Sequence, residues 1–335
     1  MSSHADTKAQ VRYLRLFGTT EVVPFQNEIR MGTQKPIVIV GSISMDMVCC
    51  TPRIPAVGET VIGTSFSTTP GGKGANQAVA AARLGYPNQM VGGVGDDAYG
   101  RPLLEALSQD GVGIAGMEPS AGASGLAHIF LAEDGHNSIV IVQGANGRVD
   151  RAHIDRHASL IRSAGIVLCQ LELPLESTCH AIAMAAEAGV PVMLDPAPAA
   201  PLPESLFEKI AWFTPNETEA ALYVGDGASV EEAAEKLFAK GIKGVALKRG
   251  AEGAYVAVAG GRAEWVRAFP VQAVDTVAAG DCFNGAFAVA LMEGRDPWEA
   301  ARFASAAAAI CVTRRGAQAS MPRRDEVDAF LRERG

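Results

Sequence analysis

Short apolar segments alternate with longer amphipathic segments through most of the chain. The apolar segments lie at residues 36–42, 89–95, 165–172, 190–196, 211–215 and 244–250. Strands that are apolar on both faces are typical of a parallel sheet covered on both sides. Helical patterns occupy residues 73–85, 97–110, 151–163, 175–188, 229–240, 281–293 and 297–313. We therefore expect an α/β fold, a three-layer α/β/α sandwich with a mostly parallel central sheet.

Two segments interrupt this alternation. Residues 47–70 and 124–143 are rich in β-forming side chains, and the second contains an Asp-Gly turn between its two arms. We expect both segments to form a small β-sheet over one edge of the sandwich. Residues 1–35 lack strong periodicity, which predicts a poorly ordered N-terminal extension. The folded domain is then expected to span residues 36–332.

Composition indicates a globular chain and argues against a nucleic-acid partner. The chain has 335 residues, of which 48% are hydrophobic and 20% are charged, so a sizeable core is expected. The formal net charge of −8 argues against a broad phosphate-binding surface, because such surfaces are built from Lys and Arg. A small anionic ligand can still bind in a locally built pocket.

Cysteine spacing and the length of the apolar runs bear on the compartment. The six cysteines show neither the paired CxxC spacing of a zinc site nor the density of a disulfide scaffold. No run of about 18 apolar residues is present, and the first residues lack the apolar core of a signal peptide. We expect reduced thiols in a soluble, cytoplasmic protein with no membrane partner.

The stretch DTVAAGDCFNGA, residues 275–286, predicts an anion-binding turn at the start of a helix. Small residues such as Ala279 and Gly280 let backbone N–H groups approach a ligand, and a helix N-terminus favours negative charge. Asp281 beside this turn is well placed to accept a proton from a hydroxyl that attacks phosphorus. An isolated Gly-Asp before a helix is more often a simple helix cap.

A second glycine-rich stretch, PGGKGANQA at residues 70–78, opens another predicted helix. Its exposed N–H groups, together with Lys73 and Asn76, are suited to the hydroxyls of a sugar. An ordinary glycine turn with a solvated lysine is the alternative. Neither stretch matches the phosphate-binding loop GxxxxGK followed by Ser or Thr, and no GxGxxG dinucleotide fingerprint is present.

Acidic residues follow several predicted strands. Asn216 and Glu219, in TPNETEA, lie one helical turn apart, where they could address a magnesium ion beside phosphates or simply cap their helix. Asp46 and Glu172 lie at the carboxyl ends of predicted strands, the usual place for ligands in open α/β sheets. A cap or a surface role is equally ordinary for these two acids.

Taken together, these motifs resemble the ribokinase branch of the PfkB-type carbohydrate kinase family. GGKGANQAVAAARLG (71–85) resembles the family's first signature and DTVAAGDCFNGAFA (275–288) its second. QLELP, DPAPA, TPNETEA and VTRRGAQAS follow the family's order, so the likeness spans about residues 37–331. It implies a ribokinase-like sandwich in which the small β-sheet is a lid that covers the sugar and pairs with a second subunit's lid in a homodimer.

The resemblance implies phosphoryl transfer from ATP to the 5-hydroxyl of D-ribose. Asp281 would be the base, and the N–H groups of Ala279, Gly280 and Asp281 would form the anion hole for the phosphoryl group. The residues implied to bind the sugar are Ser44, Asp46, Gly72, Lys73, Asn76, Glu172 and Asp281.

Nucleotide and cation sites are implied by the same likeness. ATP would contact Asn216, the loop from Lys248 through Gly250 to Gly253, Gly280, and Ser305 on the adenine side, and Mg²⁺ would accompany it near Asn216 and Glu219. The positions matching a potassium site are the Asp275 carboxylate, the carbonyls of Val277, Cys311, Arg314 and Gly316, and the Ser320 hydroxyl.

Three departures from the family pattern leave the substrates open. Ser44 stands where ribokinases usually place an asparagine, so one bidentate group is replaced by a shorter hydroxyl. Lys248 replaces a frequent threonine, and Ser305 a frequent histidine or asparagine. A kinase for 2-deoxyribose, another sugar or a nucleoside is therefore an alternative, and a catalytically silent sugar-binding regulator is an alternative of another class.

Overall fold

The computed structural model describes residues 34–334, so the greater part of the predicted N-terminal extension lies outside the described residues. Within the described part, nine strands form one sheet in the order β13-β12-β11-β10-β9-β8-β1-β4-β5. The neighbours from β11 to β5 are parallel, whereas β12 and β13 are antiparallel additions at one edge. The prediction of a mostly parallel sheet is confirmed.

The strands of this sheet are short and mostly buried. In sheet order they are β13 (Ala263–Arg267), β12 (Gly253–Val258), β11 (Gly244–Lys248), β10 (Trp212–Phe213), β9 (Val192–Leu194), β8 (Ile166–Cys169), β1 (Ile37–Val40), β4 (Asn88–Gly95) and β5 (Gly113–Ser120). Alternate residues of one strand enter opposite cores: Ile37 and Ile39 pack on one side, and Val38 and Val40 on the other. This explains why the central strands are apolar throughout.

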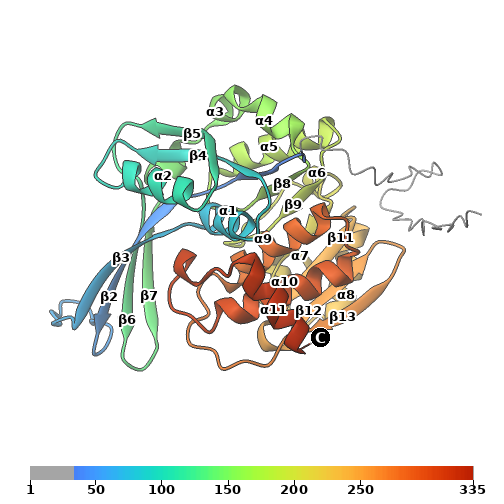
Figure 1. The fold of residues 1–335 in the computed structure, drawn as a ribbon. Helices are drawn as coiled ribbons and strands as arrows, with labels where there is room; N and C mark the ends of the chain where they lie inside the picture. Colours follow the sequence, from blue (N-terminus) through green and yellow to red (C-terminus); the bar gives the residue numbers. More distant parts are fainter. Residues whose placement is uncertain (1–33, 335) are drawn as a thin grey trace, which may run out of the picture. The chain divides into compact units, whose positions relative to one another are not determined.

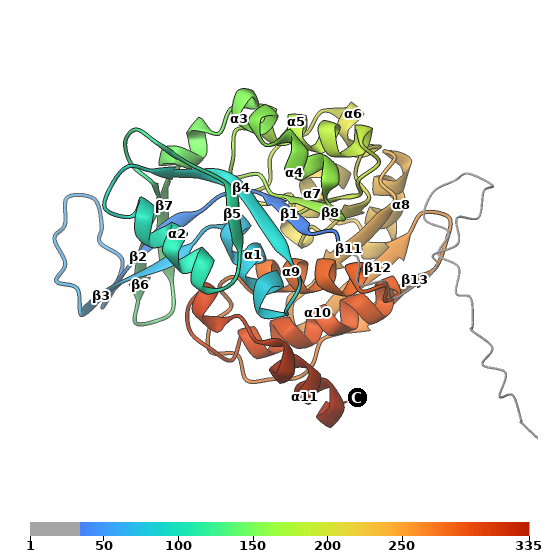
Figure 2. The ribbon, with the colours of Figure 1, turned by 45° about the horizontal axis from the view of Figure 1, so that its top comes forward.

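Helices cover both faces of the sheet (Figures 1 and 2). One core contains residues of α1 (Lys73–Arg83), α2 (Gly100–Gln109), α9 (Ala279–Met292), α10 (Pro297–Cys311) and α11 (Arg324–Arg334). The other contains residues of α3 (Arg151–Arg156), α4 (Ala158–Ser163), α5 (Leu175–Glu187), α6 (Glu204–Phe207), α7 (Glu217–Val224) and α8 (Val230–Ala239). The expected three-layer sandwich is therefore present.

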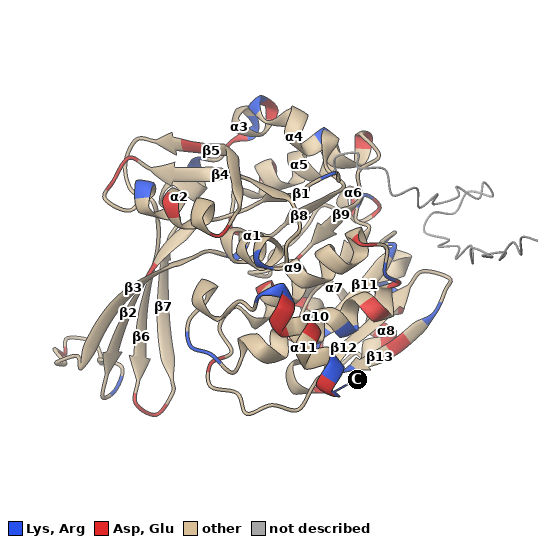
Figure 3. Cartoon of the chain, viewed as in Figure 1, with Lys and Arg blue, Asp and Glu red and all other residues tan. Residues whose placement is uncertain are grey.

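A second sheet of four strands, in the order β3-β2-β6-β7, extends from the layered body, as Figure 1 shows for the described residues. Its strands are β2 (Ser44–Thr51), β3 (Ser65–Gly71), β6 (Gly125–Ala132) and β7 (Asn137–Val142). Its first strand begins at Ser44 rather than at residue 47, so Ser44 and Asp46 belong to it. Asp46 is the only Asp, Glu, Lys or Arg within these four fully described strands, and most of the small sheet is uncharged in Figure 3.

Several elements differ from the sequence predictions. The helix expected over 151–163 is two helices, and the break falls at His157, whose imidazole Nε2 lies 2.8 Å from Glu118 Oε1. β5 was not predicted because it contains two glycines and a proline, which are unusual in the interior of a sheet. They are tolerated here because β5 is an edge strand. The antiparallel hairpin β12–β13 and the C-terminal helix α11 were also missed.

None of the helices within residues 34–334 combines the length and the apolar character that crossing a membrane requires.

Candidate active site

Polar residues gather where five neighbouring parallel strands of the described sheet end. Carboxyl ends of parallel strands meet at one edge of a sheet, which is the usual ligand-binding edge. In sheet order the residues at or just beyond these ends are Lys248 after β11, Asn216 after β10, Asp195 after β9, Gln170 and Glu172 after β8, and Ser42 after β1. The topology therefore brings together residues that are up to about two hundred positions apart in the chain.

The glycine-rich start of α1 is held against the loop that joins β1 to β2. Asn146 fixes this loop, because its side chain accepts a hydrogen bond from Ile43 N at 3.1 Å and donates one to Ile43 O at 2.8 Å. Gly72 has φ +92°, and a Cβ atom there would lie 2.7 Å from Ile43 Cα. Gly72 thus satisfies both a left-handed backbone and a close approach. The signal for Asn146 in the sequence was too weak to single it out.

The stretch predicted to bind an anion forms a turn at the start of α9. Ala278 has φ +59°, a left-handed conformation that is uncommon outside glycine and is found at functional sites. The Ala279 N–H donates to Thr276 O in a long bond of 3.3 Å. The N–H groups of Gly280 and Asp281, in the first turn of α9, have no helical carbonyl four residues earlier. They are the donors best placed for an anion.

Asp281 is 5% exposed and is held by side chains of α1. Asn76 Nδ2 donates to its Oδ2 at 2.9 Å, and Gln77 Nε2 donates to its Oδ1 at 3.2 Å. Burial raises the pKa of the Asp281 carboxyl, the nearby Lys73 ammonium lowers it, and Asp195 raises it further. Asp281 is not a plain helix cap, because its carboxylate bonds to another helix instead of to its own.

α1 and α9 approach closely enough for these bonds because Gly285 has no side chain. A Cβ atom on Gly285 would lie 2.7 Å from Gln77 O and 2.8 Å from Ala80 Cβ. The two signature motifs, about two hundred residues apart, therefore form one unit in the fold.

Lys73 supplies positive charge between the acids of the site. Asp281 chiefly raises the pKa of the Lys73 ammonium, with burial opposing it and Asp195, Glu172 and Glu219 adding to the increase. The ammonium is therefore charged at neutral pH. The backbone N–H of Lys73 donates to Glu172 Oε2 at 3.1 Å, and the Ser42 hydroxyl donates to the same oxygen.

Ser44 and Asp46 meet on the small sheet, facing the same site. The Ser44 hydroxyl donates to Asp46 Oδ1 at 2.9 Å. Burial raises the pKa of the Asp46 carboxyl to about 6, the bond from Ser44 lowers it, and Glu172 and Asp281 raise it. A Cβ atom on Gly71 would lie 2.2 Å from the Asp46 carboxylate, so the neighbouring strand leaves room for this acid.

Asn216 and Glu219 form the capping box of α7, the alternative that the sequence left open. Glu219 N donates to Asn216 Oδ1 at 2.8 Å, and Asn216 N donates to Glu219 Oε2 at 2.7 Å. They also border the site: burial raises the pKa of the Glu219 carboxyl, while the Lys248 ammonium lowers it. Capping and ligand binding are compatible here, because each carboxylate oxygen can accept more than one bond.

The residues implied for the nucleotide fall into two groups. Lys248 ends β11, and Gly250 and Gly253 follow it with φ +50° and +110°, in a turn that closes on β12. Ser305 is 7% exposed within α10. Among the hydrogen bonds of the described residues, none joins Ser305 to the Asp281 group, so the structure does not connect these two predictions.

The residues implied for the monovalent cation lie together behind the anion-binding turn. The Asp275 carboxylate accepts bonds from Val277 N at 3.0 Å and Gly316 N at 2.9 Å, so it joins the two loops that supply the carbonyls. The Cys311 carbonyl accepts from Arg314 N at 3.0 Å. Ser320 Oγ donates to Ala317 O at 2.7 Å and lies 3.0 Å from Cys311 Sγ, an arrangement that leaves one lone pair of the hydroxyl for a cation. An all-oxygen donor set of this kind suits a hard cation.

Sequence reasoning missed three polar residues of the site: Gln77, Gln170 and Asp195. Gln77 Nε2 bridges Asp281 and Asp195, and its Oε1 accepts a bond from Gln170 Nε2 at 2.8 Å. The motifs DPAPA and QLELP contained the signal for Asp195 and Gln170, since each places a polar residue directly after an apolar strand. Their side-chain partners could not be read from the sequence.

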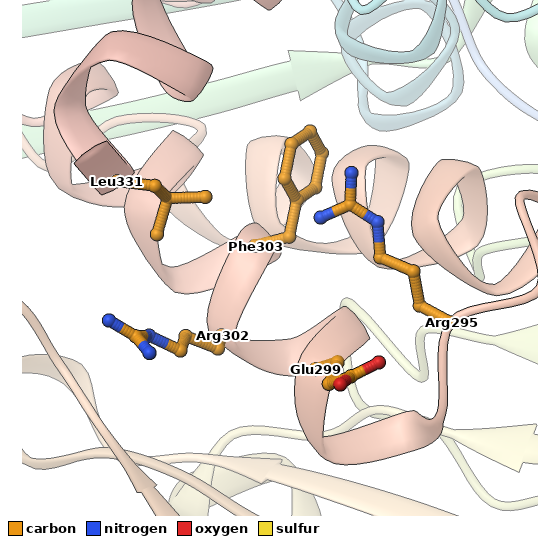
Figure 4. A pocket seen from close by; sticks show the side chains of 5 residues that line it. All are labelled: Arg295, Glu299, Arg302, Phe303 and Leu331. Atoms are coloured by element: carbon orange, nitrogen blue, oxygen red, sulfur yellow. The ribbon is translucent and has the colours of Figure 1, made fainter. Parts of the chain in front are cut away.

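A separate pocket lies at the other end of α9 (Figure 4). Its volume is about 360 Å³, and it is lined by Arg295, Glu299, Arg302, Phe303 and Leu331. Because α9 has 14 residues, its ends are about 21 Å apart. This pocket is therefore distinct from the Asp281 site.

Comparison with known proteins gives a consistent family assignment. Residues 34–324 match the family described as pfkB family carbohydrate kinase. The chain is 45% identical over 296 residues to the ribokinase of Bacillus subtilis, covering 88% of this chain and 99% of that protein. It is 36% identical over 301 residues to the deoxyribokinase of Salmonella typhi, covering 88% of this chain and 98% of that protein.

Solved structures support the same conclusion at the level of the fold. A structure of Arabidopsis thaliana ribokinase complexed with ribose and ATP superposes with a TM-score of 0.84 at 38% identity. The match covers 89% of this chain and 99% of that one.

Proposed function

The chain belongs to the pfkB family of carbohydrate kinases, and we propose that it transfers the γ-phosphoryl group of ATP to the 5-hydroxyl of D-ribose. The observation that carries this proposal is the buried Asp281 at the start of α9, next to the first-turn N–H groups of Gly280 and Asp281. A proton acceptor and an anion-binding turn at one point are what phosphoryl transfer to a hydroxyl requires. The similarity to ribokinases supports ribose as the sugar.

In the proposed reaction the 5-hydroxyl oxygen attacks the γ-phosphorus of ATP. The new O–P bond forms while the bond from that phosphorus to the bridging oxygen breaks, so ADP leaves with the electron pair of that bond. The hydroxyl proton passes to the Asp281 carboxylate. The N–H groups of Gly280 and Asp281, with Ala279 adjacent, stabilise the charge on the phosphoryl oxygens.

Sugar binding is assigned to the groups on α1 and the small sheet. Asn76 Oδ1 is buried and has no hydrogen-bond partner among the described residues, so a sugar hydroxyl can donate to it. Asp46, Glu172 and the Ser44 hydroxyl oxygen are acceptors, the Lys73 ammonium is a donor, and Gly72 precedes Lys73 at the start of α1. Pairing of several hydroxyls with fixed groups favours a polyol over an apolar ligand.

Magnesium would be held with ATP by the oxygens of Asn216 and Glu219. Their fit is supported by the donor set, because the Asn216 amide oxygen and the two Glu219 carboxylate oxygens lie together in the capping box and oxygen is the ligand that Mg²⁺ prefers. When bound, the ion neutralises phosphate charge. The residues themselves orient α7 toward the site through their capping box.

Potassium would be held by the Asp275 carboxylate, the carbonyls of Val277, Cys311, Arg314 and Gly316, and the Ser320 hydroxyl. The fit rests on the oxygen-only donor set and on the two loops that Asp275 joins. We expect replacement of K⁺ by Na⁺ or Li⁺ at equal ionic strength to lower kcat, because a smaller ion would draw these loops inward and move Ala278. Initial rates with choline chloride as the salt control provide the measurement. Equal initial rates in all of these salts would contradict the assignment of a potassium site.

Substrate choice is the direct test of the proposed function. ADP release should be fastest with D-ribose when ribose, 2-deoxyribose, fructose 6-phosphate and adenosine are compared at equal concentration. A site built to hydrogen-bond a hydroxyl discriminates strongly against an analogue that lacks it. Faster turnover of 2-deoxyribose or adenosine would establish the alternative sugar or nucleoside kinase. ADP release with none of them would contradict the proposed ribose kinase and favour the sugar-binding regulator.

A homodimer formed through the small sheet is part of the proposal. Its support is apolar exposure: Phe66 is 65% exposed, Val140 57% and Ile141 58%, on strands that are nearly uncharged. Exposed apolar side chains on a nearly uncharged sheet are typical of an interaction surface. Light scattering should give twice the chain mass, and Ile141→Glu should reduce it; a monomeric wild-type protein would refute the dimer.

A cytoplasmic location completes the proposal. All six cysteines lie in the described residues and are free, which supports a reducing compartment, and ATP is the proposed phosphoryl donor.

A further inference from the structure

Lys248, at the end of β11, extends its side chain to the turn at the start of α9. Its side chain is 14% exposed, and its Nζ lies 3.0 Å from Asp195 Oδ1, in an ion pair whose acid is 3% exposed. A Cβ atom built on Gly280 would lie 3.4 Å from the same Nζ. The Lys248 ammonium therefore lies beside the residue whose N–H is assigned to the phosphoryl group.

Asp195 holds Lys248 from one side and the catalytic acid from the other. Its Oδ2 accepts a bond from Gln77 Nε2 at 3.0 Å, and the same Nε2 donates to Asp281 Oδ1 at 3.2 Å. Lys248, Asp195, Gln77 and Asp281 thus form one continuous chain of contacts. The position of the Lys248 ammonium is in this way tied to that of the proton acceptor.

A plain structural role would make Lys248 only the counterion of a buried carboxylate, since an unpaired buried charge is costly. Two observations point further. The bond to Asp195 uses one of the three N–H donors of the ammonium, which leaves two for a ligand. The position facing Nζ is a glycine, so the space beside the ammonium at the start of α9 is free of a side chain.

We propose that Lys248 is a catalytic residue that binds the transferring phosphoryl group of ATP, and that Asp195 is its positioning residue. This inference rests on the proposed function. Lys248 stays protonated throughout: it donates hydrogen bonds to phosphoryl oxygens while the 5-hydroxyl oxygen bonds to phosphorus, the bridging P–O bond breaks and Asp281 takes the proton. A fixed cation next to developing phosphoryl charge stabilises the transition state more than the separated reactants.

A first test compares the affinities for nucleotides with and without the terminal phosphoryl group. Lys248→Met keeps the length of the side chain and removes its charge. It should weaken binding of the ATP analogue AMP-PNP by about 10-fold or more, the scale of a charge-assisted hydrogen bond, while ADP and ribose bind as in wild type. Calorimetry with AMP-PNP, ADP and ribose measures the three affinities. Equal losses for AMP-PNP and ADP would overturn a contact to the terminal phosphoryl group.

A double variant separates catalysis from neutralisation of Asp195. We expect Lys248→Met to lower kcat by about 100-fold, as loss of one transition-state donor does, and to lower the midpoint of thermal unfolding because Asp195 loses its partner. Adding Asp195→Asn removes the unpaired charge and should restore the unfolding midpoint but not kcat. Recovery of kcat in the double variant would overturn the proposal, because Lys248 would then only neutralise Asp195.

Control measurements keep this inference apart from the proposed function. Lys240→Met removes a surface lysine that pairs with Glu204 at 2.9 Å, and it should leave kcat unchanged. Wild-type turnover of ribose with ATP tests the proposed function by itself. If wild type turns over ribose and Lys248→Met retains the same kcat, the proposal for Lys248 fails while the kinase function stands.

Discussion

Replacing Asp281 by asparagine should lower kcat with ribose and ATP by about 100-fold or more, the scale of a lost general base, and leave the fold intact. The asparagine oxygen can still accept one hydrogen bond, but its amide cannot take the proton of the attacking hydroxyl. The raised pKa that burial gives the Asp281 carboxyl is what makes it a competent proton acceptor near neutral pH.

The fold should tolerate this change because the α1 side chains can rearrange. Asp281 accepts hydrogen bonds from the side-chain nitrogens of Asn76 and Gln77. The NH₂ group of an asparagine at position 281 would therefore face one of these two N–H donors, with no acceptor between them. A flip of Asn76 removes the conflict, since its Oδ1 has no partner among the described residues and can accept from the new amide. The loss of one buried charge also removes a desolvation cost.

Steady-state kinetics and thermal unfolding of Asp281→Asn give the measurement. Asp110→Asn is the matched control, because Asp110 pairs with Arg83 at 2.7 Å outside the site and should change kcat little. Near-normal turnover by Asp281→Asn would refute its role as the base. A collapse of the unfolding midpoint would instead assign Asp281 a mainly structural part.

Replacing Gly72 by alanine should destabilise the protein by about 2–5 kcal/mol and raise KM for ribose. A left-handed φ costs an alanine about 1–2 kcal/mol, and overpacking typically adds about 1–3 kcal/mol. Overpacking is expected because the new Cβ atom would lie 2.7 Å from Ile43 Cα and 2.9 Å from Ser44 N, which are backbone atoms that cannot rotate away. Their displacement would move the Ser44 and Asp46 side chains that are assigned to the sugar.

The other end of α1 supplies a matched control for this variant. Gly85 has φ +80° and no atom within 4 Å of a built Cβ, so Gly85→Ala keeps the backbone strain and omits the collision. It should cost about 1–2 kcal/mol and leave KM unchanged. Thermal and urea unfolding of both variants measure the loss of stability, and steady-state kinetics measure KM for ribose. Equal effects of the two substitutions would show that strain alone, and no collision at the sugar site, explains Gly72.

The hydrophobic pattern predicted the layered sheet, and the two glycine-rich motifs indicated the candidate site. Both signals depend on residues that are close together in the chain. Apolar runs of strand length identify a sheet buried on both faces, and a small-residue turn before a helix identifies an anion-binding site. The strands that patterning missed are atypical: β5 has glycines and a proline at an edge of the sheet. The break at His157 also follows no local signal, since it coincides with a contact to Glu118 on a distant strand.

The sequence by itself determined the sandwich, its mostly parallel sheet, and which motifs carry the candidate chemistry, because periodicity and turn composition are properties of neighbouring residues. Only the tertiary structure decided that Gln77 joins Asp281 to Asp195, and that Lys248 from β11 lies beside Gly280. These contacts join residues 32 to 204 positions apart in the chain. Sheet order and the close packing of α1 on α9 set such distances, and neither is encoded in any single local segment.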